Sequence, residues 1–128
     1  MSKARAIVIG HGDFAAGMPT AVDRITGHGA TLLALSVQDR SLPQIEAWLR
    51  ENLAATGAMV VFTDLQAGSA TMAARKALRD LPDVSLVVGT NLPMLLDFVL
   101  STAASPAEAA KHAAERGRTA IVVHGGTQ

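Results

Sequence analysis

A histidine stands between two glycines directly after the first apolar run of the chain, in the sequence Gly10-His11-Gly12. The run, residues 6–9, predicts a buried strand, and α/β sheets place their chemistry at the carboxyl ends of such strands. A neutral imidazole is a good nucleophile toward phosphorus, and flanking glycines leave it open to a large partner. We therefore interpret His11 as a candidate nucleophile, with a turn histidine of no chemical function as the alternative.

An acidic residue, Asp64, stands at the end of the strand predicted from the third apolar run, residues 59–62. This is the place that His11 has at the end of the first strand. In doubly wound sheets these two strands are usually neighbours. A carboxylate beside the imidazole holds one ring nitrogen as N–H and leaves the other free to attack. Asp64 is thus a candidate catalytic residue, and a turn or helix cap is the equally weighted alternative.

Two further loops lie at the same predicted edge of the sheet. Gly68 and Ser69 open a helix whose free N–H groups, with the Ser69 hydroxyl, are suited to cradle a phosphoryl group together with the amides around Gly12. The alternative is that Ser69 is a plain N-cap residue, and both roles can hold at once. Asn91 and Pro93 follow the fourth run, and taken alone they favour a turn.

Short β-branched runs alternate with Ala- and Leu-rich segments along the chain. The apolar runs are residues 6–9, 31–35, 59–62, 84–88 and 120–123. Their near-continuous apolar character predicts strands covered on both faces, hence an α/β fold with a doubly wound, mainly parallel sheet flanked by helices. The last run has little chain after it, so we expect an edge strand or a strand that pairs with another molecule, and a dimer would cover that edge.

The helix signals are local. Residues 14–25 predict a helix in which Pro19 causes a kink or a late start. Ser41 begins a capping box for a helix to about residue 55 that Gly57 ends. Further helices are predicted at residues 70–81 with Ser69 as cap, at 94–100, and from a Ser105 cap with Pro106 first to about Gly117.

Composition narrows the function classes. With 128 residues, 49% of them hydrophobic, the chain is one domain, residues 1–128. The net charge of +0 and 3% aromatic content give no field or stacking platform for nucleic acid. The absence of Cys excludes disulfides and thiolate sites. His28, His112 and His124 show no zinc spacing, so we expect no metal and treat them as solvated or structural.

No apolar stretch approaches the roughly 20 residues of a membrane span, and the first run is interrupted too early for a secretion signal. We expect a cytoplasmic protein with no membrane insertion. Gly10 to Ala15 also fits the dinucleotide pattern G-x-G-x-x-A, which makes a nucleotide-binding module an alternative. That pattern needs an acidic residue at the end of strand two, where Ser36 and Gln38 stand instead, and no Walker A run is present.

Three motifs in series resemble one family. Strand–G-H-G-x-F-A-x-G, strand–D-L-x-x-G-S and G-T-N-L-P-M-L-L occur in the order and spacing of the IIA component of the mannose family of the bacterial sugar phosphotransferase system. The resemblance covers nearly the whole chain. It implies that His11 accepts a phosphoryl group from the phosphocarrier HPr and passes it to a separate IIB component, with no organic cofactor. It also implies a homodimer in which the last strand is exchanged.

The resemblance assigns roles residue by residue. Asp64 matches the residue that hydrogen-bonds the active histidine, Ser69 matches a loop residue beside the phosphoryl group, and the segment containing Asn91 and Pro93 matches a lining of the site. The family usually has Gly-Gly-Ser-Pro where this chain has Ala67-Gly68-Ser69-Ala70. Two relatives of the same fold remain as alternatives: the phosphotransfer subunit of a dihydroxyacetone kinase, and a regulatory phosphoprotein that moves no sugar.

Overall fold

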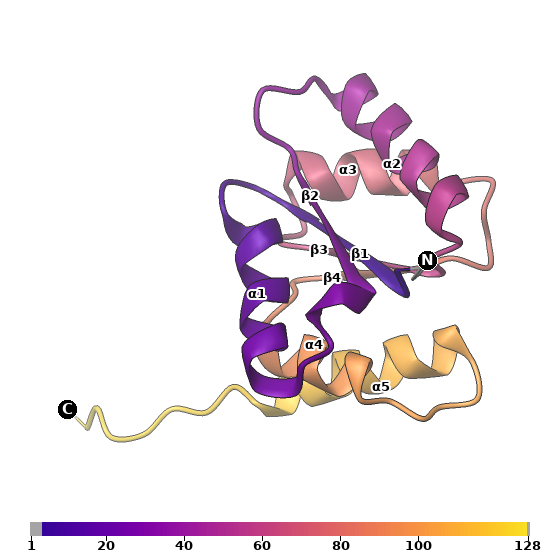
Figure 1. Ribbon diagram of the computed structural model, residues 1–128. Coiled ribbons are helices and arrows are strands. Elements are labelled where there is room, and N and C mark those ends of the chain that lie inside the picture. The colour runs from indigo at the N-terminus through magenta and orange to yellow at the C-terminus, as the bar shows by residue number, and fades with distance from the viewer. Residues whose placement is uncertain (1–3, 128) are drawn as a thin grey trace.

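A parallel four-stranded sheet forms the centre of the computed structural model, which describes residues 4–127 of the predicted domain (Figure 1). The strands are β1 (Ala6–Gly10), β2 (Leu32–Ser36), β3 (Val60–Thr63) and β4 (Ser85–Val88). Their order across the sheet is β2-β1-β3-β4, with every pair parallel. The chain therefore reverses its winding direction between β1 and β3, which confirms the doubly wound fold class and puts the switch point between these strands.

Helices cover both faces of the sheet (Figure 1). They are α1 (Phe14–Thr26), α2 (Leu42–Thr56), α3 (Ser69–Ala77), α4 (Leu92–Val99) and α5 (Pro106–Thr119), with a 3-10 turn η1 (Gly29–Thr31) before β2. None of these described helices is both long and apolar enough to cross a membrane.

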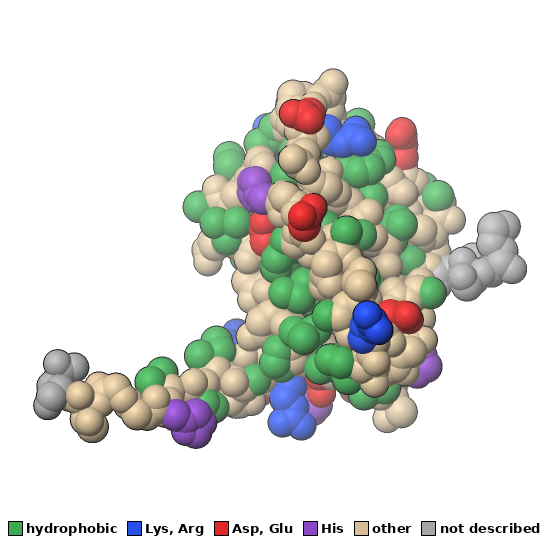
Figure 2. All heavy atoms as spheres, turned by 60° about the vertical axis from the view of Figure 1, so that its left-hand side comes forward, with side chains coloured by type: hydrophobic (Ala, Val, Ile, Leu, Met, Phe, Trp, Pro, Cys, Tyr) green, Lys and Arg blue, Asp and Glu red, His purple; other side chains and the backbone are tan. Residues whose placement is uncertain are grey.

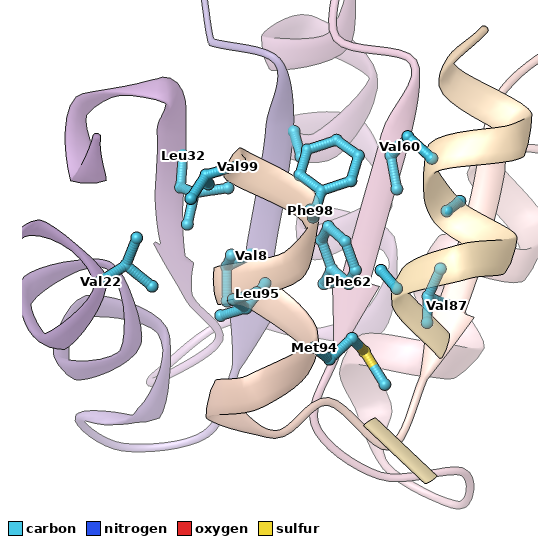
Figure 3. Close-up of a cluster of buried hydrophobic side chains, with 14 residues drawn as sticks. Val8, Val22, Leu32, Val60, Phe62, Val87, Met94, Leu95, Phe98 and Val99 are labelled. Carbon is cyan, nitrogen blue, oxygen red and sulfur yellow. The ribbon is translucent and has the colours of Figure 1, made fainter. Parts of the chain in front are cut away.

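The alternation of side chains along β1 divides the core into two clusters. Ala6 and Val8 face α1, α4 and α5, where Phe62 and Phe98 meet edge to face at 5.1 Å between ring centres (Figure 3). Ile7 and Ile9 face α2 and α3. Because β1 is covered on both sides, all five of its residues are buried and the strand is a rigid base for the loop that follows it.

Helix starts agree with the local signals in most places. The Ser41 capping box is present in both directions, and Gly57 ends α2 in the left-handed conformation. Ser105 caps α5 through the Glu108 N–H. A late start of the first helix is wrong, because α1 begins at Phe14 and continues through Pro19.

Several helix ends differ from the prediction. Helix α3 ends at Ala77, four residues before the predicted end at residue 81. Helix α4 begins at Leu92, two residues early, because the Asn91 side chain caps it. Helix α5 continues past Gly117 to Thr119. Gly117 lies within the helix, where a side chain would not fit: a Cβ there would lie 2.9 Å from the Met94 methyl and 3.1 Å from Asn91 Oδ1.

The segment after α5 was expected to form a fifth strand, and that prediction is wrong for the single chain. Residues 121–127 have no regular structure and project from the body of the protein (Figure 1). Apolar side chains lie along this tail in the space-filling view (Figure 2), and Ile121, Val122 and Val123 are 73%, 63% and 86% exposed. A β-branched run forms a strand only where a sheet edge accepts its hydrogen bonds, and in the described chain no such edge meets the tail.

Candidate functional site

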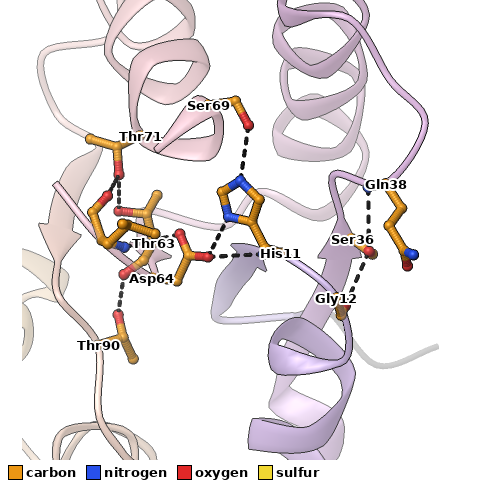
Figure 4. Close-up of polar contacts among 10 residues, drawn as sticks. His11, Gly12, Ser36, Gln38, Thr63, Asp64, Ser69, Thr71 and Thr90 are labelled. Atoms are coloured by element: carbon orange, nitrogen blue, oxygen red, sulfur yellow. Dashed lines mark hydrogen bonds and ion pairs between the residues drawn. The ribbon is translucent and has the colours of Figure 1, made fainter. Parts of the chain in front are cut away.

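His11 and Asp64 meet at the switch point of the sheet (Figure 4). Ile9 of β1 pairs in register with Thr63 of β3, so the residues that follow these strands emerge side by side. The distance from His11 Nδ1 to Asp64 Oδ2 is 2.7 Å, and the same oxygen accepts the His11 backbone N–H at 2.9 Å. The imidazole is 51% exposed while the carboxylate is only 9% exposed. The His11 ring is thus accessible to solvent, while the Asp64 carboxylate that accepts its hydrogen bond is largely buried.

The contact with Asp64 determines which ring nitrogen is free. An ionised carboxylate only accepts hydrogen bonds, so the Nδ1 that touches it must carry the hydrogen. In the neutral ring, Nε2 then has a free lone pair. This nitrogen faces Ser69, whose Oγ lies 3.3 Å away (Figure 4). The hydroxyl therefore donates toward Nε2, and the nucleophilic atom of the ring is the one on the exposed side.

Asp64 is held in its ionised form. Partial burial by itself raises the pKa of this carboxyl group, but hydrogen bonds from the His11 ring, the His11 backbone N–H and the Leu65 backbone N–H outweigh that effect. The pKa of Asp64 consequently lies below its usual value. A carboxylate that stays ionised near neutral pH keeps Nδ1 protonated and stabilises positive charge on the ring.

The amino end of α3 lies against the ring. Ser69 was predicted to be the N-cap of this helix, but the cap residue is Gly68, which has no side chain to occupy the first amides. A Cβ on Gly68 would lie 3.0 Å from His11 Cε1, so the glycine lets the helix end approach the imidazole closely. Because Ser69 is released from capping, its hydroxyl is available at Nε2. Uncapped helix amides beside an open nitrogen suit an anion.

The two glycines next to His11 are required for different structural reasons. A Cβ on Gly10 would lie 2.8 Å from the Phe14 ring and 3.0 Å from Asp64 Oδ2, so Gly10 makes room for the carboxylate. Gly12 has a φ of +53°, which a residue with a side chain adopts at a cost, and its carbonyl accepts the Ser36 hydroxyl at 3.2 Å (Figure 4). The role of Gly12 in phosphate binding stays a prediction.

The other two predicted lining residues take part in different contacts. The side-chain oxygen Oδ1 of Asn91 accepts the Met94 N–H at 3.1 Å, and the side-chain NH2 group donates to the Gly117 carbonyl at 3.0 Å. Pro93 lines a cavity of about 660 Å³ between α4 and α5. The structure thus brings His11, Asp64, Gly68 and Ser69 together, whereas Asn91 joins α4 to α5, and its predicted place in the site, with that of Pro93, stays a prediction.

A second histidine–carboxylate pair lies on this other side of the molecule. His112 Nδ1 is 2.7 Å from Asp97 Oδ2, the same distance as in the first pair. His112 lies in the middle of α5, whereas His11 follows a strand and lies against the amino end of α3. The pair alone therefore does not make a site for an anion, and it offers an internal control for the first one.

Sequence reasoning missed a group of buried threonines behind Asp64. Thr63, Thr71 and Thr90 are 0%, 1% and 7% exposed and are hydrogen-bonded to one another or to the loop after β3 (Figure 4). The available signal was a hydroxyl residue at the end of an apolar strand, immediately before the acid.

Fold and site together define a class: doubly wound α/β proteins with an accessible, carboxylate-oriented histidine at the switch point of the sheet. The particular family follows from the sequence, since residues 5–115 match the family described as PTS system fructose IIA component, EIIA-man, and the chain belongs to it. Members of this family are components of the sugar phosphotransferase system. The resemblance found from the motifs is thereby confirmed.

Solved structures agree with this fold over nearly the whole chain. The mannose/sorbose-specific IIA subunit of the phosphotransferase system from Enterococcus faecalis is similar with a TM-score of 0.81 at 23% identity, covering 98% of each chain. The phosphotransferase system component EIIA from Streptococcus agalactiae has a TM-score of 0.82 at 22% identity, covering 94% of this chain and 96% of its own. A PTS IIA protein associated with the fucose utilization operon of Streptococcus pneumoniae gives 0.69 at 19%, covering 96% of each. A search of curated proteins finds no match.

Proposed function

We propose that this protein is a cytoplasmic phosphocarrier of a sugar phosphotransferase system. His11 accepts a phosphoryl group from phospho-HPr and passes it to a separate IIB component. The observation that carries this proposal is the arrangement of His11 between Asp64 on Nδ1 and the amino end of α3 on Nε2. Family membership supports it independently.

The transfer exchanges one imidazole for another. The Nε2 lone pair of His11 attacks phosphorus in line, the bond from phosphorus to the donor imidazole breaks, and the donor ring leaves with the electron pair. The hydrogen on Nδ1 stays in place, and Asp64 stabilises the positive charge that develops on the ring. The amides at the start of α3 and the Ser69 hydroxyl stabilise the phosphoryl oxygens.

The openness of the site supports a protein donor rather than an enclosed small ligand. The His11 ring is half exposed, and the 660 Å³ cavity lies elsewhere, between α4 and α5. Small-molecule sites bury most of their ligand in a concave pocket. A partner that presents its own phosphohistidine instead needs an accessible ring, which His11 provides.

The direct test is incubation with radiolabelled phosphoenolpyruvate, Enzyme I and HPr of the source organism. We expect acid-labile, base-stable label on the wild type and none on His11→Ala. His112→Ala is the matched control, because it removes a ring with the same 2.7 Å carboxylate contact, and it should be labelled like the wild type. Absence of label on folded wild-type protein would exclude the phosphocarrier function and favour the nucleotide-binding module, which a thermal shift with NAD or AMP then tests.

The protein that receives the phosphoryl group from His11 distinguishes the sugar-transport function from the two alternatives of the same fold. Phosphorylated protein is mixed with the IIB component or with the kinase subunit of a dihydroxyacetone kinase, and loss of label from His11 is followed. Rapid transfer to IIB alone supports the sugar-transport function. Transfer to the kinase subunit, or to neither, would assign the protein to the kinase system or to a regulatory function.

The exposed tail supports a homodimer as part of this proposal. In a second copy, an open edge of the sheet offers the hydrogen-bonding groups that residues 120–123 lack in the single chain. Light scattering after size exclusion should give a dimer for the full chain and a monomer for a chain that ends at Thr119. A full-length monomer at micromolar concentration would contradict the exchange of this segment.

A further inference from the structure

Three buried threonine hydroxyls form a connected group beneath the loop that carries Asp64 (Figure 4). Thr71 Oγ1, on α3, lies 2.7 Å from Thr63 Oγ1 and 2.6 Å from the Leu65 carbonyl oxygen. Thr90 Oγ1 donates to the Thr63 carbonyl at 2.8 Å. A buried hydroxyl destabilises the folded protein unless it is hydrogen-bonded, and each of these three hydroxyls has a partner.

The number of hydrogens fixes the direction of these bonds. Each hydroxyl has one hydrogen, and a carbonyl oxygen can only accept. Thr71 must therefore donate its hydrogen to the Leu65 carbonyl, and Thr63 must donate to Thr71. The Thr71 hydroxyl therefore accepts from Thr63 and donates to the Leu65 carbonyl, and its single hydrogen is used in the bond to Leu65.

Leu65 connects this group to the site. Its carbonyl accepts from Thr71, while its N–H donates to Asp64 Oδ1 at 2.9 Å. Its side chain is 48% exposed, so burial does little to hold the residue. A further donor to the carbonyl, the Gly68 N–H, is distant at 3.4 Å. The backbone of Leu65 is thus held mainly by Thr71 on one side and by the carboxylate on the other.

We propose that Thr71 is a positioning residue for phosphoryl transfer. Its hydroxyl fixes the backbone of Leu65, whose N–H orients the Asp64 carboxylate, which in turn keeps the hydrogen of His11 on Nδ1. The inference rests on the proposed function of His11 as phosphoryl acceptor. The alternative is that Thr71 only contributes to the stability of the α3 packing, and the two differ in what happens to the His11 ring.

The test compares Thr71→Ala with Thr90→Ala, which is the matched control. Both remove one buried hydroxyl, but the Thr90 hydroxyl donates to the Thr63 carbonyl and not to Leu65 or Asp64, and the Thr63 carbonyl keeps the Gly89 and Thr90 N–H groups. Both variants should lower the Tm. Only Thr71→Ala should lower the rate of transfer from phospho-HPr, by about 10-fold, the lower end of the loss found when residues that orient metal-binding histidines are removed. Thr71→Ser, which keeps the hydroxyl, should restore the rate to within about threefold.

A second readout is independent of transfer. Nitrogen-15 NMR of the His11 ring near neutral pH should show Nδ1 protonated in the wild type, Thr90→Ala and Thr71→Ser, and a mixture of both tautomers in Thr71→Ala. A folded Thr71→Ala with the wild-type tautomer and transfer rate would overturn the proposal. If that variant does not fold, Thr71→Val carries the same expectations. Should the wild type accept no phosphoryl group, the proposed function fails while the tautomer still decides the role of Thr71.

Discussion

Replacing Asp64 by Asn tests the orientation of the His11 ring most directly. The carboxylate accepts three hydrogen bonds, two from His11 at Oδ2 and one from Leu65 at Oδ1. An amide has one oxygen and one NH2 group, so whichever way it turns, its donor faces an N–H. If the NH2 group faces His11, the ring must place its hydrogen on Nε2 to accept at Nδ1, and the nucleophilic lone pair is lost.

The size of the effect follows from the bond that is removed. A hydrogen bond to a charged group contributes about 1.5–3 kcal/mol, and it strengthens here as positive charge develops on the ring. At about 1.4 kcal/mol for each factor of ten, the rate of phosphoryl transfer should fall roughly 10- to 140-fold. The Asp64→Asn protein should still fold, since side-chain volume is conserved.

Rapid-quench measurement of label transfer from phospho-HPr to the variant gives this rate. Asp97→Asn is the control, because it changes the His112 pair, which has the same 2.7 Å contact, and it should transfer at the wild-type rate. A folded Asp64→Asn protein that transfers within twofold of the wild type would refute the orienting role of the carboxylate. An equal loss in both variants would show that the assay reports stability rather than ring orientation.

Three further predictions follow from the geometry. Gly68→Ala has a permitted backbone but puts a Cβ 3.0 Å from His11 Cε1, so the ring must shift; transfer should slow several-fold with little change in Tm, and unchanged transfer would show that the ring moves freely. The lowered pKa of Asp64 adds stability above the usual carboxyl pKa of 3.8 that is lost as pH falls through the native value, so urea unfolding should show the stability gap between wild type and Asp64→Asn closing below about pH 4. A gap that persists at low pH would contradict this. Ser41→Ala removes the hydrogen bond from the Gln44 N–H to Ser41 Oγ, one of the two bonds of the α2 capping box, and should cost about 1 kcal/mol of unfolding free energy with normal transfer; an unchanged free energy of unfolding would contradict a stabilising cap.

The strands and the reactive pair could be predicted from the sequence because both depend on local patterns. Near-continuous apolar runs specify strands covered on both faces, and the alternation with helices specifies a parallel sheet. In that topology β1 and β3 are neighbours, so placing His11 and Asp64 at their carboxyl ends predicts the contact that is found. Where one side chain could either cap a helix or face the site, the sequence did not decide between the two roles.

Ser69 and Asn91 illustrate that choice. Both precede helical segments and both can cap, so sequence alone does not say which hydroxyl or amide is free. In the fold, Gly68 takes the cap position and Ser69 faces the ring, whereas Asn91 caps α4 and reaches Gly117. The difference arises from the close approach of α3 to His11, which is a property of tertiary packing. The buried threonines were missed for the same reason, because their partners come from β3, α3 and the loop after β4.

The tail shows where a correct local preference gives a wrong structure. Residues 120–123 favour a strand, yet a strand exists only with a partner edge, and the preference of a β-branched run does not identify one. Within the described chain, α5 ends at Thr119, and the segment after it leaves the body with its apolar side chains exposed. Natural proteins rarely leave an apolar segment and an open sheet edge both uncovered. In the described chain the tail and the open sheet edge do not meet, and this is the observation from which the homodimer was proposed.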